Sequence, residues 1–201
     1  FVHVGEEVIP LQIIGKQNLS NIAGAYTVCE WLGVKRDEFY HAIKDFKSSI
    51  RYLEFVASDG ESVVYQDFAH TPFKLKASIH AVKEQFPASK LLTIIELNPY
   101  DVLDTDKIKQ YNKTMEESDS AIVFVNKSII REKNIDLDNI INVIKFNFNH
   151  DDLLVISNVN DLISYVESFD NQHFNMLFMS SNNYSGVNML SFSDKFFSIV
   201  K

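Results

Sequence analysis

The pattern of apolar and polar positions is mostly helical in the first 46 residues, and in the rest of the chain strand-like runs alternate with helical ones. Between residues 19 and 32 apolar residues recur every three or four positions, which predicts a helix that ends at Gly33. The apolar run 8–14 before it predicts a strand, with Pro10 marking an edge or a bulge. Residues 36–46 repeat the helical spacing and predict a second helix.

Strand-like and helical runs alternate in the rest of the chain. Two β-rich runs flank the tight-turn sequence at residues 58–60, and Thr71-Pro72 is typical of the start of a helix, here 72–85. The nearly continuous apolar run 90–97 is typical of a buried parallel strand. The remaining predicted elements are a helix at 105–117, a strand at 121–125, a short helix within 128–139, a short strand at 142–146, a helix at 160–169, a strand at 174–179 and a closing helix at 187–200.

This alternation from residue 62 onward predicts an α/β fold with a mostly parallel, Rossmann-like sheet and flanking helices. The first 46 residues, with one predicted strand and two helices, do not fit the alternation and are too few to bury a core alone. We therefore expect residues 1–46 to be the end of a preceding domain and residues 47–201 to form a further domain. The chain does not begin with Met, so we expect it to be part of a longer protein.

Composition and charge narrow the function. The 201 residues carry a net charge of -8, which disfavours binding to nucleic acid. A single cysteine, Cys29, excludes an internal disulfide and a cysteine-rich zinc site, and the scattered histidines have no metal-ligand spacing. No apolar run is long enough to span a membrane and no signal sequence is present, so we expect a cytoplasmic protein that binds no membrane and holds no metal on these residues.

The first candidate binding residues are Asn18 and Asn21, which share one face of a predicted helix start. A side-chain amide offers a donor and an acceptor together, which suits the edge of a base such as adenine. Ordinary helix capping is the alternative for this pair.

A second candidate group lies in VVYQDFAHTP, where a predicted strand ends at Asp67 and His70 precedes a helix. Ligands of open α/β sheets bind beyond the carboxyl ends of the strands, and a carboxylate there suits sugar hydroxyls. Alternatively, Asp67 caps the turn and His70 is a loop histidine. Arg51 precedes a predicted strand and could clamp a phosphate, or it is a surface residue.

Three further candidates follow other predicted strands at the same edge of the sheet. Asn98 follows the strand at 90–97, and Ser181 and Asn182 follow the strand at 174–179. Their small polar side chains could approach a ligand closely, or they are plain loop residues.

Four segments in order, GKQNLSNIAGAYTVCEWLGV, FKSSIRYLEFV, QDFAHTP and TIIELNP, resemble the Mur ligases, with the similarity strongest over residues 8–100. These are ATP-dependent, ADP-forming amide ligases that make cell-wall precursors. The resemblance implies that Asn18 and Asn21 lie by the adenine, Arg51 by the terminal phosphate and Asp67 by the ribose of ATP. His70 matches the histidine of the family motif. The amine substrate would bind near Asn98, Ser181 and Asn182, and no residue of this chain is expected to transfer protons.

The closing segment MSSNNYSGVNML resembles the muropeptide ligase branch, which joins L-alanyl-γ-D-glutamyl-meso-diaminopimelate to UDP-N-acetylmuramate during wall recycling. The alternatives are the sibling branch that adds L-alanine to the same nucleotide sugar, and a non-catalytic α/β binding domain. Gln17 stands where the family has histidine, and the family's phosphate-binding loop is absent. We expect that loop and the Mg²⁺ ligands to lie upstream, and the chain alone to be inactive as a ligase; its oligomeric state is left open.

Overall fold

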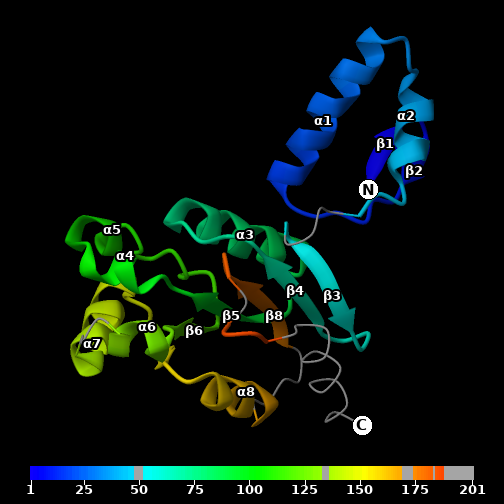
Figure 1. The fold of residues 1–201 in the computed structure, drawn as a ribbon. Coiled ribbons are helices and arrows are strands. Elements are labelled where there is room, and N and C mark those ends of the chain that lie inside the picture. Colours follow the sequence, from blue (N-terminus) through cyan, green and yellow to red (C-terminus); the bar gives the residue numbers. More distant parts are fainter. Residues whose placement is uncertain (48–51, 133–135, 169–173, 183, 188–201) are drawn as a thin grey trace.

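The structure, a computed structural model, describes residues 1–47, 52–132, 136–168, 174–182 and 184–187. Two parts of the chain can be distinguished in Figure 1. The N-terminal unit, residues 2–46, holds a two-stranded antiparallel sheet and two helices, and the sheet unit, residues 52–187, holds a six-stranded sheet. The elements of the N-terminal unit are β1 (Val2–Val4), β2 (Glu7–Ile9), α1 (Lys16–Trp31) and α2 (Arg36–Ile43).

The six-stranded sheet has the order β3-β4-β8-β5-β6-β7. Only the edge strand β3 runs antiparallel to its neighbour, and the other four pairings are parallel. The predicted α/β fold with a mostly parallel sheet is therefore confirmed. The strands are β3 (Glu54–Ser58), β4 (Val63–Asp67), β5 (Lys90–Glu96), β6 (Ser120–Phe124), β7 (Leu153–Ile156) and β8 (Phe174–Met179).

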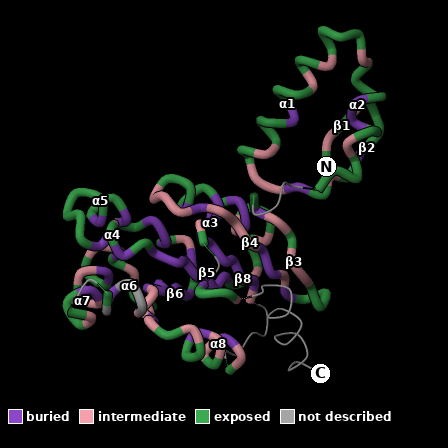
Figure 2. The backbone as a smooth tube through the Cα atoms, viewed as in Figure 1, coloured by how far each residue is buried: buried purple, intermediate pink, exposed green. Residues whose placement is uncertain are grey.

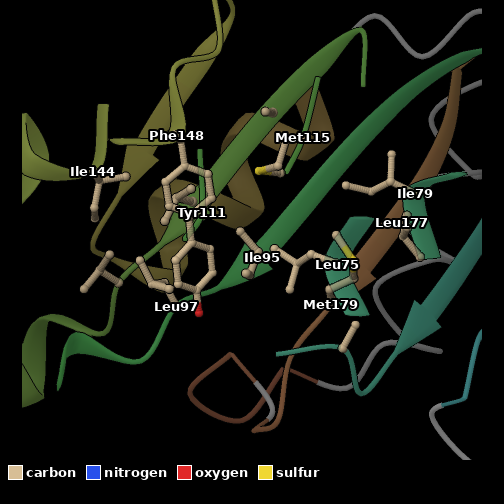
Figure 3. Packing of buried hydrophobic residues seen from close by; sticks show 14 of the residues in the cluster. Leu75, Ile79, Ile95, Leu97, Tyr111, Met115, Ile144, Phe148, Leu177 and Met179 are labelled. Carbon is tan, nitrogen blue, oxygen red and sulfur yellow. The ribbon is translucent and has the colours of Figure 1, made fainter. Parts of the chain in front are cut away.

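Helices cover both faces of this sheet because its buried strands alternate apolar side chains between the two faces. Leu91 and Ile95 of β5 pack on the face with α3, α5 and α7, whereas Leu92 and Ile94 pack on the face with α8. Figure 3 shows the first of these two layers, in which the ring of Tyr111 stacks on Phe148 with centroids 5.0 Å apart. The helices are α3 (Pro72–Gln85), α4 (Pro99–Leu103), α5 (Thr105–Lys109), α6 (Lys127–Glu132), α7 (Leu137–Phe148) and α8 (Val159–Ser168).

Three local predictions were wrong. The expected strand 142–146 lies inside α7, where the Asp136 carboxylate caps the helix and three apolar residues at spacing four, Ile140, Ile144 and Phe148, are buried. The strands β1 and β7 and the short helix α4 were not predicted. The expected strand 8–14 is instead the second half of a hairpin, whose pairing with β1 ends at Ile9, directly before Pro10. The expected helix at 105–117 is α helix only over Thr105–Lys109, and the expected closing helix lies, from residue 188 onward, outside the described residues.

The two units touch near the start of α1. Gly15 has a φ of +90°, and a Cβ on it would lie 3.0 Å from the Cβ of Ala81 in α3. Ile14 packs against the core of the sheet unit. The N-terminal unit therefore lies beside the second half of α3, whereas α4 and α5 lie beside its first turn (Figure 1).

Candidate functional site

A cavity of about 330 Å³ opens at the carboxyl edge of the sheet, where the neighbouring strands β4, β8 and β5 end. Three connections and two short helices form its wall: the loop from β4 to α3, the residues after β5, α4 with α5, and the loop after β8. This is the place where open α/β sheets bind ligands. The lining residues are His70, Thr71, Pro72, Glu96, Asn98, Asp101, Lys107, Gln110, Tyr111 and Ser181.

His70 enters the cavity from the loop between β4 and α3 with a defined orientation. Its Nδ1 lies 2.8 Å from the carbonyl oxygen of Phe68. The imidazole ring also packs edge to face with the Phe68 ring, with the ring centroids 5.1 Å apart. A carbonyl oxygen only accepts hydrogen bonds, so Nδ1 carries the hydrogen. In the neutral imidazole the lone pair is therefore on Nε2, which is the acceptor that His70 offers to a ligand.

Tyr111 and Asp101 connect the helical side of the cavity to the β4–α3 loop. The Tyr111 hydroxyl lies 3.1 Å from Oδ2 of Asp101 and 3.3 Å from the carbonyl oxygen of His70. Burial, together with the nearby charge of Asp101, raises the pKa of Tyr111, so the hydroxyl remains a donor. Lys107 pairs with the other oxygen of Asp101 at 3.4 Å, and the Lys107 side chain is 58% exposed.

Glu96 brings a buried carboxylate to the same cavity from the end of β5. The residue is 6% exposed, and its Oε2 accepts hydrogen bonds from the Ser180 hydroxyl and from the Tyr184 N–H at 2.8 Å. Tyr184 is itself buried, with its hydroxyl 2.8 Å from the carbonyl oxygens of Ile94 and Met179. Glu96 therefore joins the end of β5 to the loop after β8.

The structure brings three of the predicted residues together, since His70, Asn98 and Ser181 all line the cavity. The Asn98 side chain accepts the N–H of Tyr100 at 3.0 Å and so caps α4 while it faces the cavity. Asn182 is exposed beside Ser181, and its N–H donates to the Ser180 hydroxyl at 2.8 Å.

Asp67 is not part of the cavity wall. Its Oδ1 accepts the N–H of Ala69 at 3.0 Å, and its Oδ2 accepts the Ser78 hydroxyl at 2.6 Å. Burial raises the pKa of Asp67, although these hydrogen bonds act in the opposite direction. The carboxylate thus caps the turn between β4 and α3. Any further hydrogen bond, such as one from a ligand, would have to use the remaining lone pairs of its two oxygens.

The paired asparagines lie away from the cavity. Asn18 is half-buried and donates to the Ile14 carbonyl at 2.9 Å, and Asn21 is exposed on α1. The start of α1 lies against Ala81 of α3. Ala81 is nine residues along α3 from Pro72, which lines the cavity, and nine residues of helix span about 13 Å. Arg51 lies outside the described residues.

Seven residues of the wall were not among the predicted site residues: Thr71, Pro72, Glu96, Asp101, Lys107, Gln110 and Tyr111. The last three belong to the predicted helix 105–117. The sequence predicted a helix in that segment but not that the segment lies over the ends of the strands. No local sequence signal marks these three residues, because the burial of Tyr111 beside the strand ends depends on contacts that are distant in sequence.

Within the ranges that the structure describes, no three His, Cys, Asp or Glu side chains come together in a way that could hold a metal ion. Among the same residues, no helix has the length and apolar character needed to cross a membrane.

Curated relatives share detectable sequence with this chain, although no protein-family model matches it. The UDP-N-acetylmuramate–L-alanine ligase of Caldicellulosiruptor bescii is 29% identical over 127 residues, covering 63% of this chain and 27% of the relative. The ligase of the same name from Lactobacillus helveticus is 25% identical over 182 residues, covering 80% of this chain and 39% of the relative. The chain therefore spans well under half of the length of these relatives.

Solved structures share the fold. A UDP-N-acetylmuramate–alanine ligase of Thermotoga maritima superposes with a TM-score of 0.70 at 17% identity, over 94% of this chain and 38% of that one. A murein peptide ligase of Psychrobacter arcticus gives 0.61 at 17% identity, over 94% and 38% of the two chains. These identities establish a common fold only. The names of the sequence relatives support the Mur ligase family, at the level of the family and not of one ligase within it, whereas the solved structures support the fold alone.

Proposed function

We propose that this chain is the carboxyl-terminal part of an ATP-dependent ligase of peptidoglycan precursors, which joins an amine to UDP-N-acetylmuramate. The names of the sequence relatives support the reaction class. The observation that carries the proposal is the polar cavity at the ends of β4, β5 and β8, which we assign to the amine substrate. In this proposal residues 1–46 end the nucleotide-binding domain, and residues 47–201 form the domain that carries the amine.

The charged side chains that line the cavity favour binding of a small amino acid over binding of the cell-wall tripeptide. Glu96 and Asp101 provide two negative charges and Lys107 one positive charge, so the wall carries a net negative charge when His70 is neutral. The L-alanine zwitterion has no net charge. The tripeptide L-alanyl-γ-D-glutamyl-meso-diaminopimelate has three carboxylates and two ammonium groups, so the cavity would repel it more. We therefore propose L-alanine as the amine.

The muropeptide remains the second candidate because of one observation. The segment from Met179, the last residue of β8, to Tyr184 resembles the corresponding segment of the muropeptide ligase branch, and Ser181 of this segment lines the cavity.

Nucleotide binding by Asn18, Asn21, Arg51, Asp67 and His70 is also part of the proposal. ATP would supply the phosphoryl group that activates the muramoyl carboxyl group. The described arrangement keeps the asparagines near the far end of α3 and engages both Asp67 oxygens in the β4–α3 turn. Nucleotide binding would therefore require the N-terminal unit to shift relative to the sheet unit, a closure that also excludes water.

The test is ADP release by the full-length protein. We expect release only when ATP, Mg²⁺, UDP-N-acetylmuramate and L-alanine are all present, and none from residues 1–201 alone. Release with the tripeptide but not with L-alanine would select the second candidate. No release with either amine, from a full-length protein that is folded, would overturn the proposed function.

A further inference from the structure

We propose that Glu96 is the group in the cavity that binds the ammonium group of the ligand, and so determines the preference for a ligand with a free amine. This assignment deepens the proposed function and rests on it only for the identity of the amine. The argument depends on how Glu96 differs from the other acidic residue of the wall, Asp101.

The first difference is burial. Glu96 is buried, whereas Asp101 is only partly buried. A carboxylate that is removed from water interacts more strongly with a ligand charge, because the local dielectric is lower. Glu96 therefore provides the stronger electrostatic contact for a cation that enters the cavity.

The second difference is charge compensation. Asp101 already pairs with Lys107 and accepts the Tyr111 hydroxyl. Glu96 accepts hydrogen bonds from two neutral groups, the Ser180 hydroxyl and the Tyr184 N–H, and in the described part of the chain it forms no ion pair. Neutral donors satisfy the hydrogen bonds of a carboxylate but leave its charge in place. A buried carboxylate without a cation is costly, and a ligand ammonium group would offset that cost.

The third observation is that hydrogen bonds from the loop after β8 hold Glu96 in place. Its two donors belong to the loop after β8, whose Tyr184 and Ser185 have positive φ angles of 49° and 61°. The Tyr184 hydroxyl reaches carbonyl oxygens of β5 and β8, and the Ser185 hydroxyl accepts the Asn126 amide at 2.8 Å. These contacts fix the carboxylate before a ligand arrives, so little entropy is lost on binding.

The ligand that fits this arrangement is an α-amino acid or the amino end of a peptide. Its ammonium group would meet Glu96 at the buried end of the cavity, and its carboxylate would face Lys107 at the exposed end. A hydroxy acid of the same shape would lack the contact with Glu96. L-alanine and L-lactate therefore form a matched pair of probes.

The experiment measures binding of L-alanine and L-lactate to the 201-residue chain by NMR titration, in the wild type and in Glu96→Gln. Glutamine keeps an oxygen that can accept from Ser180 and Tyr184 but removes the charge. We expect the wild type to bind L-alanine more tightly than L-lactate. Glu96→Gln should weaken L-alanine binding about tenfold or more, whereas the L-lactate anion, which loses the repulsion by Glu96, should bind no less tightly than to the wild type. Asp106→Asn, at a side chain 90% exposed and outside the cavity wall, is the charge control.

A second readout separates the binding role from the role in holding the loop. Hydrogen exchange at the Tyr184 amide should be the same in the wild type and in Glu96→Gln, and in the full-length enzyme the KM for the amine should rise much more than kcat falls. Equal affinity of both proteins for L-alanine would overturn the proposal, as would Mg²⁺ alone displacing bound L-alanine. If the full-length protein is no ligase but the preference for L-alanine still depends on Glu96, the proposed function fails and this assignment stands.

Discussion

The N-terminal unit and the sheet unit differ in how completely they bury their apolar side chains (Figure 2). In the sheet unit the central strands are fully enclosed, and Leu92 and Ile94 are 0% exposed. In the N-terminal unit the buried cluster is small, and Trp31 and Leu32 at the end of α1 are 81% and 79% exposed. The members of the small cluster are Ile9, Ile13, Ile22, Phe39 and Tyr40.

This difference shows which part of the described chain can stabilise itself. A sheet covered by helices on both faces is a complete layered core. A two-stranded hairpin with two helices buries little surface, and isolated hairpins of that size are marginal in water. We therefore expect the N-terminal unit to open locally at a lower free energy than the sheet unit.

The largest effect is expected for Phe148→Ala in α7. Phe148 is fully buried and stacks on Tyr111, so its loss should lower the free energy of unfolding by about 3–5 kcal/mol. Phe146→Ala in the same helix removes a ring that is 84% exposed, and should change that free energy by less than about 0.5 kcal/mol. Urea denaturation followed by circular dichroism measures both. Similar losses for the two variants would contradict the described packing of α7.

A smaller and more local effect is expected for Ile9→Ala in β2. Ile9 is 2% exposed at the centre of the N-terminal cluster, whereas Val8 on the same strand is 52% exposed. Ile9→Ala should lower the opening free energy of the β1 and β2 amides by about 2 kcal/mol, with Val8→Ala as the control. Hydrogen exchange measures both units at once. An equal loss of protection in β5 and β8 would show that the two units unfold together, and would break the comparison.

The same contrast appears in what could be predicted from sequence. In the sheet unit the helix Pro72–Gln85 was predicted at its observed bounds because Thr71-Pro72 and the apolar spacing agree. The strand predicted at 142–146 failed because its β-branched residues favour a strand locally, while burial of Ile140, Ile144 and Phe148 on one side requires a helix. Tertiary packing decided between the strand and the helix, and such packing cannot be recognised from a short stretch of sequence.

The candidate site shows a similar limit. The rule that ligands bind beyond the strand ends placed His70, Asn98 and Ser181 at one edge, and these residues line one cavity. Tyr111 and Lys107 could not be assigned to it, because the turn of α4 and α5 over that edge depends on contacts distant in sequence. Whether Asp67 and the asparagines bind a nucleotide stays a prediction.

A moderate effect is expected for Tyr184→Phe in the loop after β8. The hydroxyl is buried near the carbonyl oxygens of Ile94 and Met179, so its removal should cost about 1–2 kcal/mol of unfolding free energy. Tyr26→Phe in the N-terminal unit removes an exposed hydrogen bond to Glu30 and should cost much less, because water replaces the lost partner. Thermal denaturation compares them. A larger loss from Tyr26→Phe would contradict the difference in burial between the units.

The smallest effect is the pH dependence of the free energy of unfolding. Two aspartates of the sheet unit, Asp67 and Asp119, contribute to it with opposite signs. Burial raises the pKa of Asp67, so the folded protein holds its proton at pH values where the unfolded chain has released it. The free energy of unfolding should therefore fall as pH rises from about 4 toward the raised value. For Asp119, burial acts to raise the pKa, but hydrogen bonds from Lys83 and the Leu91 N–H and the charges of Lys83 and Lys90 outweigh it, and the pKa lies below its ordinary value. Its contribution is present above about pH 4 and is lost as pH falls through the lowered value.

Single substitutions separate these two contributions. Asp67→Asn should flatten the stability curve above about pH 4, and Asp119→Asn should flatten it below that pH. Urea denaturation of the wild type and both variants at closely spaced pH values measures the slopes. Because α3 contributes Ser78 to one carboxylate and Lys83 to the other, both slopes should appear in the exchange of amides in the sheet unit. An Asp67→Asn variant with the wild-type slope would mean that the carboxylate is not held inside the β4–α3 turn. It would then be free to face a ligand instead.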